Sequence, residues 1–191
     1  MKTTSNKYHG HRFPTEIISH GVWLYYRFSL SLRDVWHLDE VFVKIGGERQ
    51  YLWRAVDQDG DVIDILVQRY RNARAAIRFF RKLLKGQGST PWRLVTDKLG
   101  SYGAAHRNIM PSVDHNTERY ANNLAEVSHQ RTRQRERQMR RFKSAGSAQR
   151  FLSVHGVVLN LFNLGRHQLS SANYRLLRER AFKEWNAATA A

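Results

Sequence analysis

Three acidic residues that are far apart in the sequence stand where a carboxylate can bind a metal ion: Asp39, Asp97 and Glu126. Mg²⁺ and Mn²⁺ prefer oxygen ligands, and a pair of such ions needs shared carboxylates that leave positions open for phosphate and water. One ion of a pair lowers the pKa of an attacking water or 3′-hydroxyl, and the other stabilises the leaving oxygen at phosphorus. We therefore predict that these residues hold two Mg²⁺ or Mn²⁺ ions.

Each of these carboxylates also has an ordinary structural explanation. A buried strand aspartate such as Asp39 can be satisfied by backbone donors or by an arginine, and an aspartate after a strand, such as Asp97, often caps a helix. A glutamate in the first helical turn, such as Glu126, is stabilised by the helix dipole. The metal-binding interpretation gains support from Gln130, Arg133 and Arg137, which follow Glu126 on the same predicted helix face and could contact phosphate.

The positive charge of the chain indicates a polyanionic partner. The formal net charge is +16 over 191 residues, and nucleic acid is the first candidate. An acidic membrane surface is disfavoured because the arginines do not form one cluster beside an apolar segment. Cysteine is absent, which excludes disulfides and thiolate zinc sites. The apolar stretches are too short for a membrane span and Met1 is not followed by an apolar signal region, so we expect a cytoplasmic protein.

The pattern of apolar residues predicts the elements that position the carboxylates. From Trp36 the period is two, with Asp39 on the face of Val41 and Val43 and with Glu40 on the opposite face. Asp59-Gly60 is a strong hairpin signal. The predicted elements are, in chain order, a helix at 16–28, a strand from Trp36 to Ile45, strands at 50–56 and 62–68, a helix at 72–85, a strand at 93–96, a helix at 102–109, a loop or short strand near Val113, and helices at 122–141 and 148–164.

This order of elements predicts an α/β fold with ribonuclease H-like architecture. Three antiparallel strands and at least one further strand would form a mixed sheet flanked by helices. We expect a truncated N-terminal helical segment at 1–35, the catalytic domain at 36–165 and a C-terminal helical tail at 166–191. Four aromatic residues at patterned positions are predicted to be core: Trp36, Trp53, Phe79 and Phe80.

The long predicted helix after Glu126 carries a run of cationic residues that we interpret as contacts to DNA phosphates: Arg131, Arg133, Arg135, Arg137, Arg140, Arg141 and Lys143. A merely solvated helix would usually mix charges of both signs. His129, three residues after Glu126, could touch phosphate or shuttle a proton, and an uncharged surface histidine is an equally good interpretation. Asp57, Asp59, Asp61 and Asp64 could suggest a calcium loop, but they lie on both sides of a hairpin and lack the later bidentate glutamate, so all four are predicted to be turn residues.

Several motifs, in their order and spacing, resemble the bacterial insertion-sequence transposases of family six, the group that includes the IS-twenty-six element. The matching stretches are Trp36-His37-Leu38-Asp39-Glu40-Val41, Tyr51 to Asp57, Val95-Thr96-Asp97-Lys98, Asn122 to Phe142 and Phe151 to Gly156. The resemblance implies that Asp39, Asp97 and Glu126 are the Asp-Asp-Glu catalytic set, with Arg133 at the family's basic position. It also implies strand transfer between DNA ends and a target duplex, a homodimer in the active state, and a bacterial, nucleoid-associated location.

The chain departs from the family at two places. Leu124 and Val127 stand where the family usually has Arg and a polar residue, so fewer polar side chains surround Glu126 than the family pattern implies. Val35 runs directly into the first catalytic strand, so we predict an internal deletion of the recognition helix of a helix-turn-helix. The leading hypothesis is a metal-dependent DNA transposase that this deletion can disable. The alternatives are a non-catalytic DNA-binding remnant that inhibits intact transposase, and a ribonuclease H-like nuclease.

Overall fold

The structure is a computed structural model that describes residues 35–138, 142–163 and 170–190. The helix predicted at 16–28 lies outside the described residues, as does the segment before the predicted deletion. The described chain divides into two compact units. One is Leu32–Ser153, and the residues from Val154 onward belong to the other.

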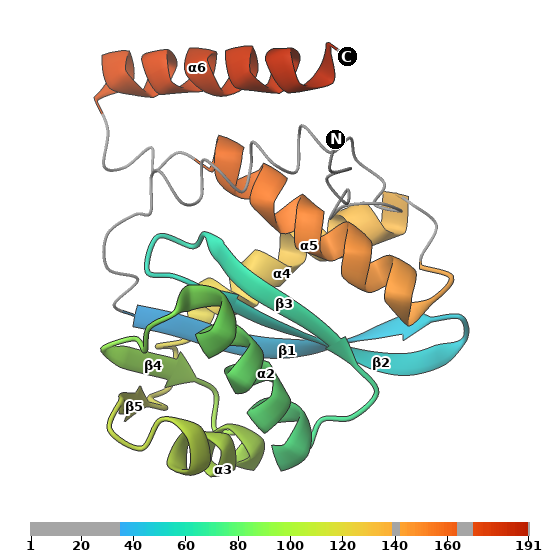
Figure 1. Cartoon of the computed structure of the whole chain (residues 1–191), viewed down its shortest axis with the longest axis vertical. Helices are drawn as coiled ribbons and strands as arrows, with labels where there is room; N and C mark the ends of the chain where they lie inside the picture. Colours follow the sequence, from blue (N-terminus) through green and yellow to red (C-terminus); the bar gives the residue numbers. More distant parts are fainter. Residues whose placement is uncertain (1–34, 139–141, 164–169, 191) are drawn as a thin grey trace, which may run out of the picture. The chain divides into compact units, whose positions relative to one another are not determined.

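Three antiparallel strands form the first half of the sheet, as predicted (Figure 1). They are β1 (Val35–Ile45), β2 (Glu48–Val56) and β3 (Val62–Gln68). Gly46 and Gly47 make the first hairpin turn with φ of 57° and 88°, a backbone conformation that favours glycine. At the second turn, one carboxylate oxygen of Asp57 accepts hydrogen bonds from the backbone N–H groups of Asp59 and Asp61, which confirms the turn interpretation for these three residues. For Asp64 it is wrong, because Asp64 lies on β3 and pairs with Lys82 of the helix that follows.

The other half of the sheet is parallel to β1. The strand order is β3-β2-β1-β4-β5, with β4 at Arg93–Thr96 and β5 at Asp114–Asn116. Helix α2 (Ala73–Gln87) connects β3 to β4, and α3 (Gly100–Ile109) connects β4 to β5. The Asn72 side chain caps α2 at its start and Gly88, with φ of 71°, ends it. β1 is therefore the central strand, with an antiparallel neighbour on one side and a parallel one on the other.

The main core lies between the sheet and helices α2 and α3. Trp53 of β2 contacts Phe79 of α2 and Tyr102 of α3, with ring centroids 6.1 and 5.4 Å apart. Trp36 and Phe80 are also buried, so the four aromatic residues predicted to be core are core. Burial of such large rings provides much of the stabilisation of this unit.

The opposite face of the sheet is covered by α4 (Asn123–Gln138) and by the start of α5 (Ala145–Phe162). Arg54, on the other face of β2 from Trp53, reaches α4, and Gln149 of α5 accepts a hydrogen bond from the Val67 backbone on β3. In the second unit, Phe162 contacts Phe182 and Trp185 of α6 (Ser171–Thr189). Within the described residues, no helix has both the length and the apolar character needed to cross a bilayer.

Candidate active site

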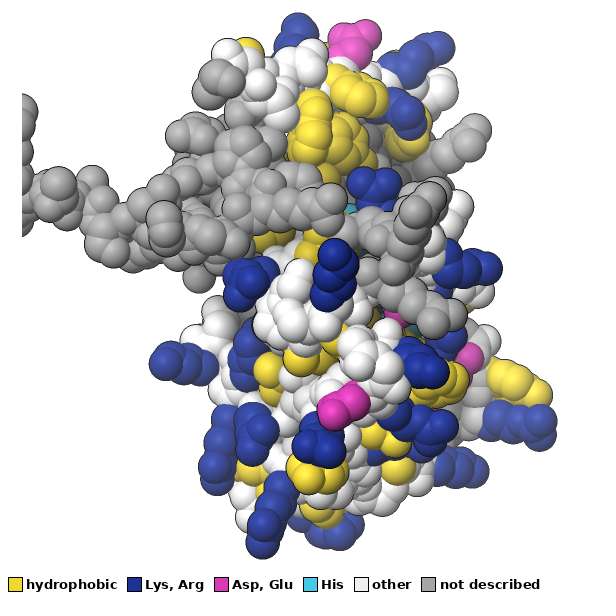
Figure 2. All heavy atoms as spheres, turned by 90° about the vertical axis from the view of Figure 1, so that its right-hand side faces the viewer, with side chains coloured by type: hydrophobic (Ala, Val, Ile, Leu, Met, Phe, Trp, Pro, Cys, Tyr) yellow, Lys and Arg dark blue, Asp and Glu magenta, His cyan; other side chains and the backbone are white. Residues whose placement is uncertain are grey.

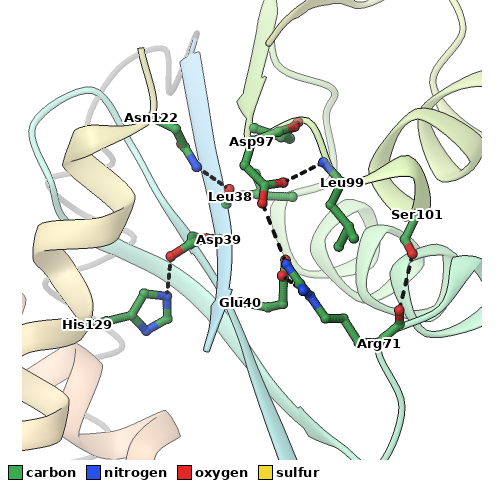
Figure 3. Close-up of polar contacts among 10 residues, drawn as sticks. Leu38, Asp39, Glu40, Arg71, Asp97, Leu99, Ser101, Asn122 and His129 are labelled. Carbon is green, nitrogen blue, oxygen red and sulfur yellow. Dashed lines mark hydrogen bonds and ion pairs between the residues drawn. The ribbon is translucent and has the colours of Figure 1, made fainter. Parts of the chain in front are cut away.

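Asp39 lies on β1 with its carboxylate on the face that α4 covers. The side chain is 13% exposed, and Oδ2 lies 3.4 Å from Nε2 of His129 on α4 (Figure 3). The pKa of Asp39 is raised to about 7, mostly by burial and then by the negative charges of Glu40, Asp97 and Glu126. Asp39 is thus a carboxylate whose negative charge has too little compensation from the protein.

Asp97 stands next to Asp39 because of the sheet register. β1 and β4 are parallel and Leu38 pairs with Thr96. Asp39 and Asp97, the residues that follow this pair, therefore lie next to each other. Oδ1 of Asp97 accepts a hydrogen bond from the Leu99 backbone at 2.9 Å, which fixes the turn before α3. Oδ2 lies 3.7 Å from the Arg71 guanidinium. Asp97 does not cap α3, whose N-cap residue is Leu99 and has no side-chain cap. The turn contact uses Oδ1, so Oδ2 can still serve as a ligand.

Glu40 is a third carboxylate at this position, and no sequence pattern selected it. Its side chain is fully buried and Arg71 donates to its Oε1 at 2.5 Å. Burial raises the pKa of Glu40 and so does the charge of Asp97, whereas the neighbouring Tyr102 hydroxyl and Arg71 lower it. Figure 3 shows Asp39 and Glu40 pointing to opposite sides of β1, with Arg71 beside Glu40 and Asp97.

The donor set at this position fits a divalent cation. One ligand atom each from Asp39, Glu40 and Asp97 lies within 4.8 Å of the others. Carboxylate oxygens are the ligands that hard cations such as Mg²⁺ and Mn²⁺ prefer. Burial is the main cause of the raised pKa values of Asp39 and Glu40, and repulsion from Asp97 adds to both; a bound cation would offset both effects. The Arg71 guanidinium supplies positive charge beside Glu40 and Asp97.

Glu126 lies in the first turn of α4 and is exposed. It is not one of the three carboxylates whose ligand atoms cluster, yet it shares a pocket of about 900 Å³ with Asp97, and its charge acts on Asp39. The pocket is lined by Thr96, Asp97, Lys98, Thr117, Glu118, Arg119, Tyr120, Asn122, Asn123, Glu126, Val127 and Gln130. Of the three residues selected from the sequence, Asp97 and Glu126 line this pocket, whereas Asp39 does not line it and meets Asp97 in the carboxylate cluster.

Buried polar contacts hold α4 against the sheet. Arg54, 2% exposed, donates to the Ser128 carbonyl at 2.6 Å and to the Thr132 hydroxyl. Burial lowers the pKa of Arg54 to about 10, so it stays charged at neutral pH. At the start of α4, the Asn122 side chain donates to the Leu38 carbonyl at 2.7 Å. These bonds fix Glu126 relative to the strand that carries Asp39.

His129 was predicted to be either a phosphate-contacting or a surface histidine, and the surface interpretation is wrong. It is 2% exposed and faces Asp39. Burial lowers its pKa well below the usual value, and the charge of Arg54 adds to this effect, so the ring is neutral at pH 7. The sequence holds only a partial signal: Arg54 interrupts the apolar run of β2, and His129 and Thr132 follow Ala125 at helical spacing, which places them on one helix face but does not identify the strand that this face meets.

The cationic residues of α4 lie largely at the surface. Arg131, Arg133, Arg135 and Arg137 are exposed, as is Lys143 beyond the helix, whereas Arg140 and Arg141 lie outside the described residues. The Arg133 guanidinium lies 5.7 Å from the ring centroid of Phe42, which is itself exposed. On the face shown in Figure 2, Lys and Arg side chains outnumber Asp and Glu. Such a surface attracts polyanions.

Comparison with known proteins identifies relatives of this chain. The family model DDE_Tnp_IS240, described as a DDE domain, matches residues 33–164. The transposase for insertion sequence-like element IS431mec of Staphylococcus aureus is 30% identical over 139 residues, which are 70% of this chain and 60% of that protein. The transposase for insertion sequence element IS257 in transposon Tn4003, also from Staphylococcus aureus, matches with the same identity and coverage. The matched region thus spans about 60% of the length of these relatives.

A solved structure supports the fold independently. The catalytic domain of Mos1 mariner transposase aligns with a TM-score of 0.50 and 13% identity, covering 91% of this chain and 90% of that one. At this identity the likeness concerns the fold alone, and it confirms the ribonuclease H-like α/β architecture predicted from the order of elements. Because the family model covers most of the chain and the fold agrees with it, this chain belongs to the DDE transposase family.

Proposed function

We propose that this chain is the catalytic core of an insertion-sequence transposase, which cleaves DNA strands and joins the exposed 3′-hydroxyl to a target duplex. The observation that carries the proposal is the meeting of Asp97, directly after the carboxyl end of β4, with Asp39, in the middle of the parallel strand β1. Asp97 also lines the pocket that Glu126 lines, and ligand and catalytic groups in α/β sheets gather beyond the carboxyl ends of strands such as β4. Family membership supports a reaction at phosphorus in which the protein's carboxylates hold the cations.

The proposed ligands are Asp39, Asp97 and Glu126, and the proposed cofactor is a pair of Mg²⁺ or Mn²⁺ ions. Such ions, when bound, activate the attacking oxygen and stabilise the leaving oxygen. Glu40 has a different part in this proposal. Its Oε1 is bound by Arg71 and its side chain is fully buried, so it serves as an anchor that holds the Arg71 guanidinium beside Asp97.

The exposed cations of α4 are proposed to bind DNA phosphates close to the carboxylates. Arg133 lies two helical turns beyond Glu126 on α4, so a DNA strand whose phosphates bind along this helix would run toward the pocket. We extend the proposal to Arg131, Arg135, Arg137, Arg140, Arg141 and Lys143, which the sequence selects by the same pattern. A homodimer holding two element ends is proposed as the active assembly. Sedimentation of the protein with DNA would test it.

The decisive experiment measures Mn²⁺-dependent nicking and strand transfer on duplex DNA for the wild type and for Asp97→Asn. Losing a metal ligand removes several kcal/mol of transition-state stabilisation, so we expect activity to fall at least about a hundredfold. The matched control is Asp114→Asn, an exposed aspartate on the neighbouring strand β5 that pairs with Arg93. It should leave activity within about twofold of the wild type.

Three other outcomes would contradict the proposal. Nicking that persists in Asp97→Asn would remove this residue from the catalytic set. DNA binding without cleavage at any metal concentration would favour the non-catalytic remnant that inhibits intact transposase. Cleavage of RNA–DNA hybrids by water, with no joining of a 3′-hydroxyl to a target, would favour the nuclease alternative.

A further inference from the structure

Tyr120 has a strained backbone conformation. It lies in the connection between β5 and α4 with φ of 68°, and it is the only non-glycine residue with positive φ among those the structure describes. Glycine and asparagine adopt this conformation readily, whereas a bulky side chain is disfavoured there. Strain of this kind persists where the surrounding structure enforces it, and it concentrates at functional sites.

Hydrogen bonds on both sides of Tyr120 enforce the conformation. The Asn116 side chain accepts from the Glu118 backbone at 2.7 Å, and the Ala121 N–H donates to the Glu118 carbonyl at 3.2 Å. The Tyr120 carbonyl accepts from the N–H of Asn123 at 3.3 Å, directly after the anchored Asn122. Hydrogen bonds therefore hold the turn on both sides of Tyr120, and the fold gains little from burial of its side chain, because the residue is 68% exposed.

The ring projects into the surroundings of the candidate active site. Tyr120 lines the pocket that Asp97 and Glu126 also line. The guanidinium of Arg119 lies 4.8 Å from the ring centroid, and Lys98 lines the same pocket. An exposed aromatic ring with one cation against it and a second cation in the same pocket suits a ligand that has a planar part and an anionic part. A nucleotide with an unpaired base has this chemistry, since bases stack on aromatic side chains and phosphates pair with cations.

We propose that Tyr120 is the stacking platform for an unpaired base next to the scissile phosphate, with Arg119 and Lys98 beside the phosphates of that nucleotide. This inference rests on the proposed function, because it takes the carboxylate pocket as the site of strand cleavage. A base can reach the ring only when it leaves the duplex, which is easiest at a frayed or overhanging end. The platform therefore distinguishes DNA ends with an unpaired terminal nucleotide from blunt ends.

The test compares the affinity for a short fluorescent duplex with blunt ends and for the same duplex with one unpaired 3′-terminal nucleotide, by anisotropy in EDTA. Base stacking on an aromatic residue typically strengthens binding by about tenfold or more. We expect the wild type to prefer the overhang by about tenfold, and Tyr120→Phe to keep that preference. Tyr120→Gly and Tyr120→Asn should lose it. Both replacements suit positive φ, so their thermal midpoints should equal or exceed that of the wild type.

The matched control is Trp92→Gly. Trp92 is 64% exposed and carries Arg93 at 4.7 Å from its ring, but it does not line the pocket. It should retain the preference for the overhang. Equal affinity of the wild type for the two duplexes, or an unchanged preference in Tyr120→Gly and Tyr120→Asn, would overturn the inference. The binding assay contains no divalent cation and no cleavage step, so this failure is distinguishable from a failure of Asp97→Asn to reduce nicking.

Discussion

Asp39 is the residue at which the chemistry of the site and the stability of the fold conflict. Its side chain is mostly buried, and three other carboxylates raise its pKa. The neighbouring His129 is neutral, so it offers no charge to offset this repulsion. An ionised Asp39 therefore costs folding free energy in the absence of a cation, which is the arrangement expected of a metal ligand.

The first prediction concerns Asp39→Asn in the metal-free protein. The folded-state pKa is about 7, above the usual aspartate value of 3.8, so the stability associated with the protonated group is complete below about pH 4 and is lost as the pH rises through about 7. Near pH 8 the asparagine variant should have a free energy of unfolding higher by about 1–3 kcal/mol, and near pH 4 the difference should shrink toward zero. Urea denaturation at the two pH values measures this. A variant less stable than the wild type near pH 8 would contradict the assigned repulsion.

Helix α4 is the element that carries Glu126 and the exposed arginines that follow it. Its inner face holds Ala125, His129 and Thr132, all buried, whereas Glu126 and Arg133 are exposed. The inner face is polar, and it is attached to β2 by Arg54, which bonds a carbonyl and a hydroxyl of the helix. A planar guanidinium can serve two acceptors at once in fixed directions, which an ammonium group does less well.

The second prediction concerns Arg54→Lys. The shorter reach and single nitrogen of lysine would leave one buried acceptor of α4 without its partner, so the free energy of unfolding should fall by about 1–3 kcal/mol. Arg49→Lys, on the exposed part of the same strand, serves as the control and should change stability by less than about 0.5 kcal/mol. Chemical denaturation of both variants measures the difference. Equal effects would mean that Arg54 acts only as a generic cation on β2.

At the scale of the whole molecule, charge is the dominant feature. The net charge of +16 would attract DNA to any part of the surface, but the exposed arginines of α4 lie beside the carboxylate pocket. If DNA binds along this helix, each arginine that pairs with a phosphate releases a counterion, and the affinity depends on salt accordingly.

The third prediction concerns Arg133→Ala. The slope of log K against log salt on duplex DNA should become less negative by about 0.9 if Arg133 makes one phosphate contact. Arg107→Ala, which removes an exposed arginine from α3, should leave the slope unchanged. Affinity measured across a salt series for the two variants gives the comparison. An equal loss of slope in both would indicate binding spread over the whole surface.

Local patterns in the sequence were sufficient for the elements and for much of the core. The period of two around Asp39, the Asp59-Gly60 turn and the Asn72 cap act through neighbouring residues, so β1, β3 and α2 were predicted close to their bounds. The order of these elements also predicted the fold, and the spacing of the motifs predicted the family. What only the tertiary structure decided was the set of contacts between distant segments: Glu40 with Arg71, Arg54 with α4, and His129 with Asp39. Such contacts depend on which strands are neighbours and which helix covers which face, and no periodicity along the chain encodes that choice.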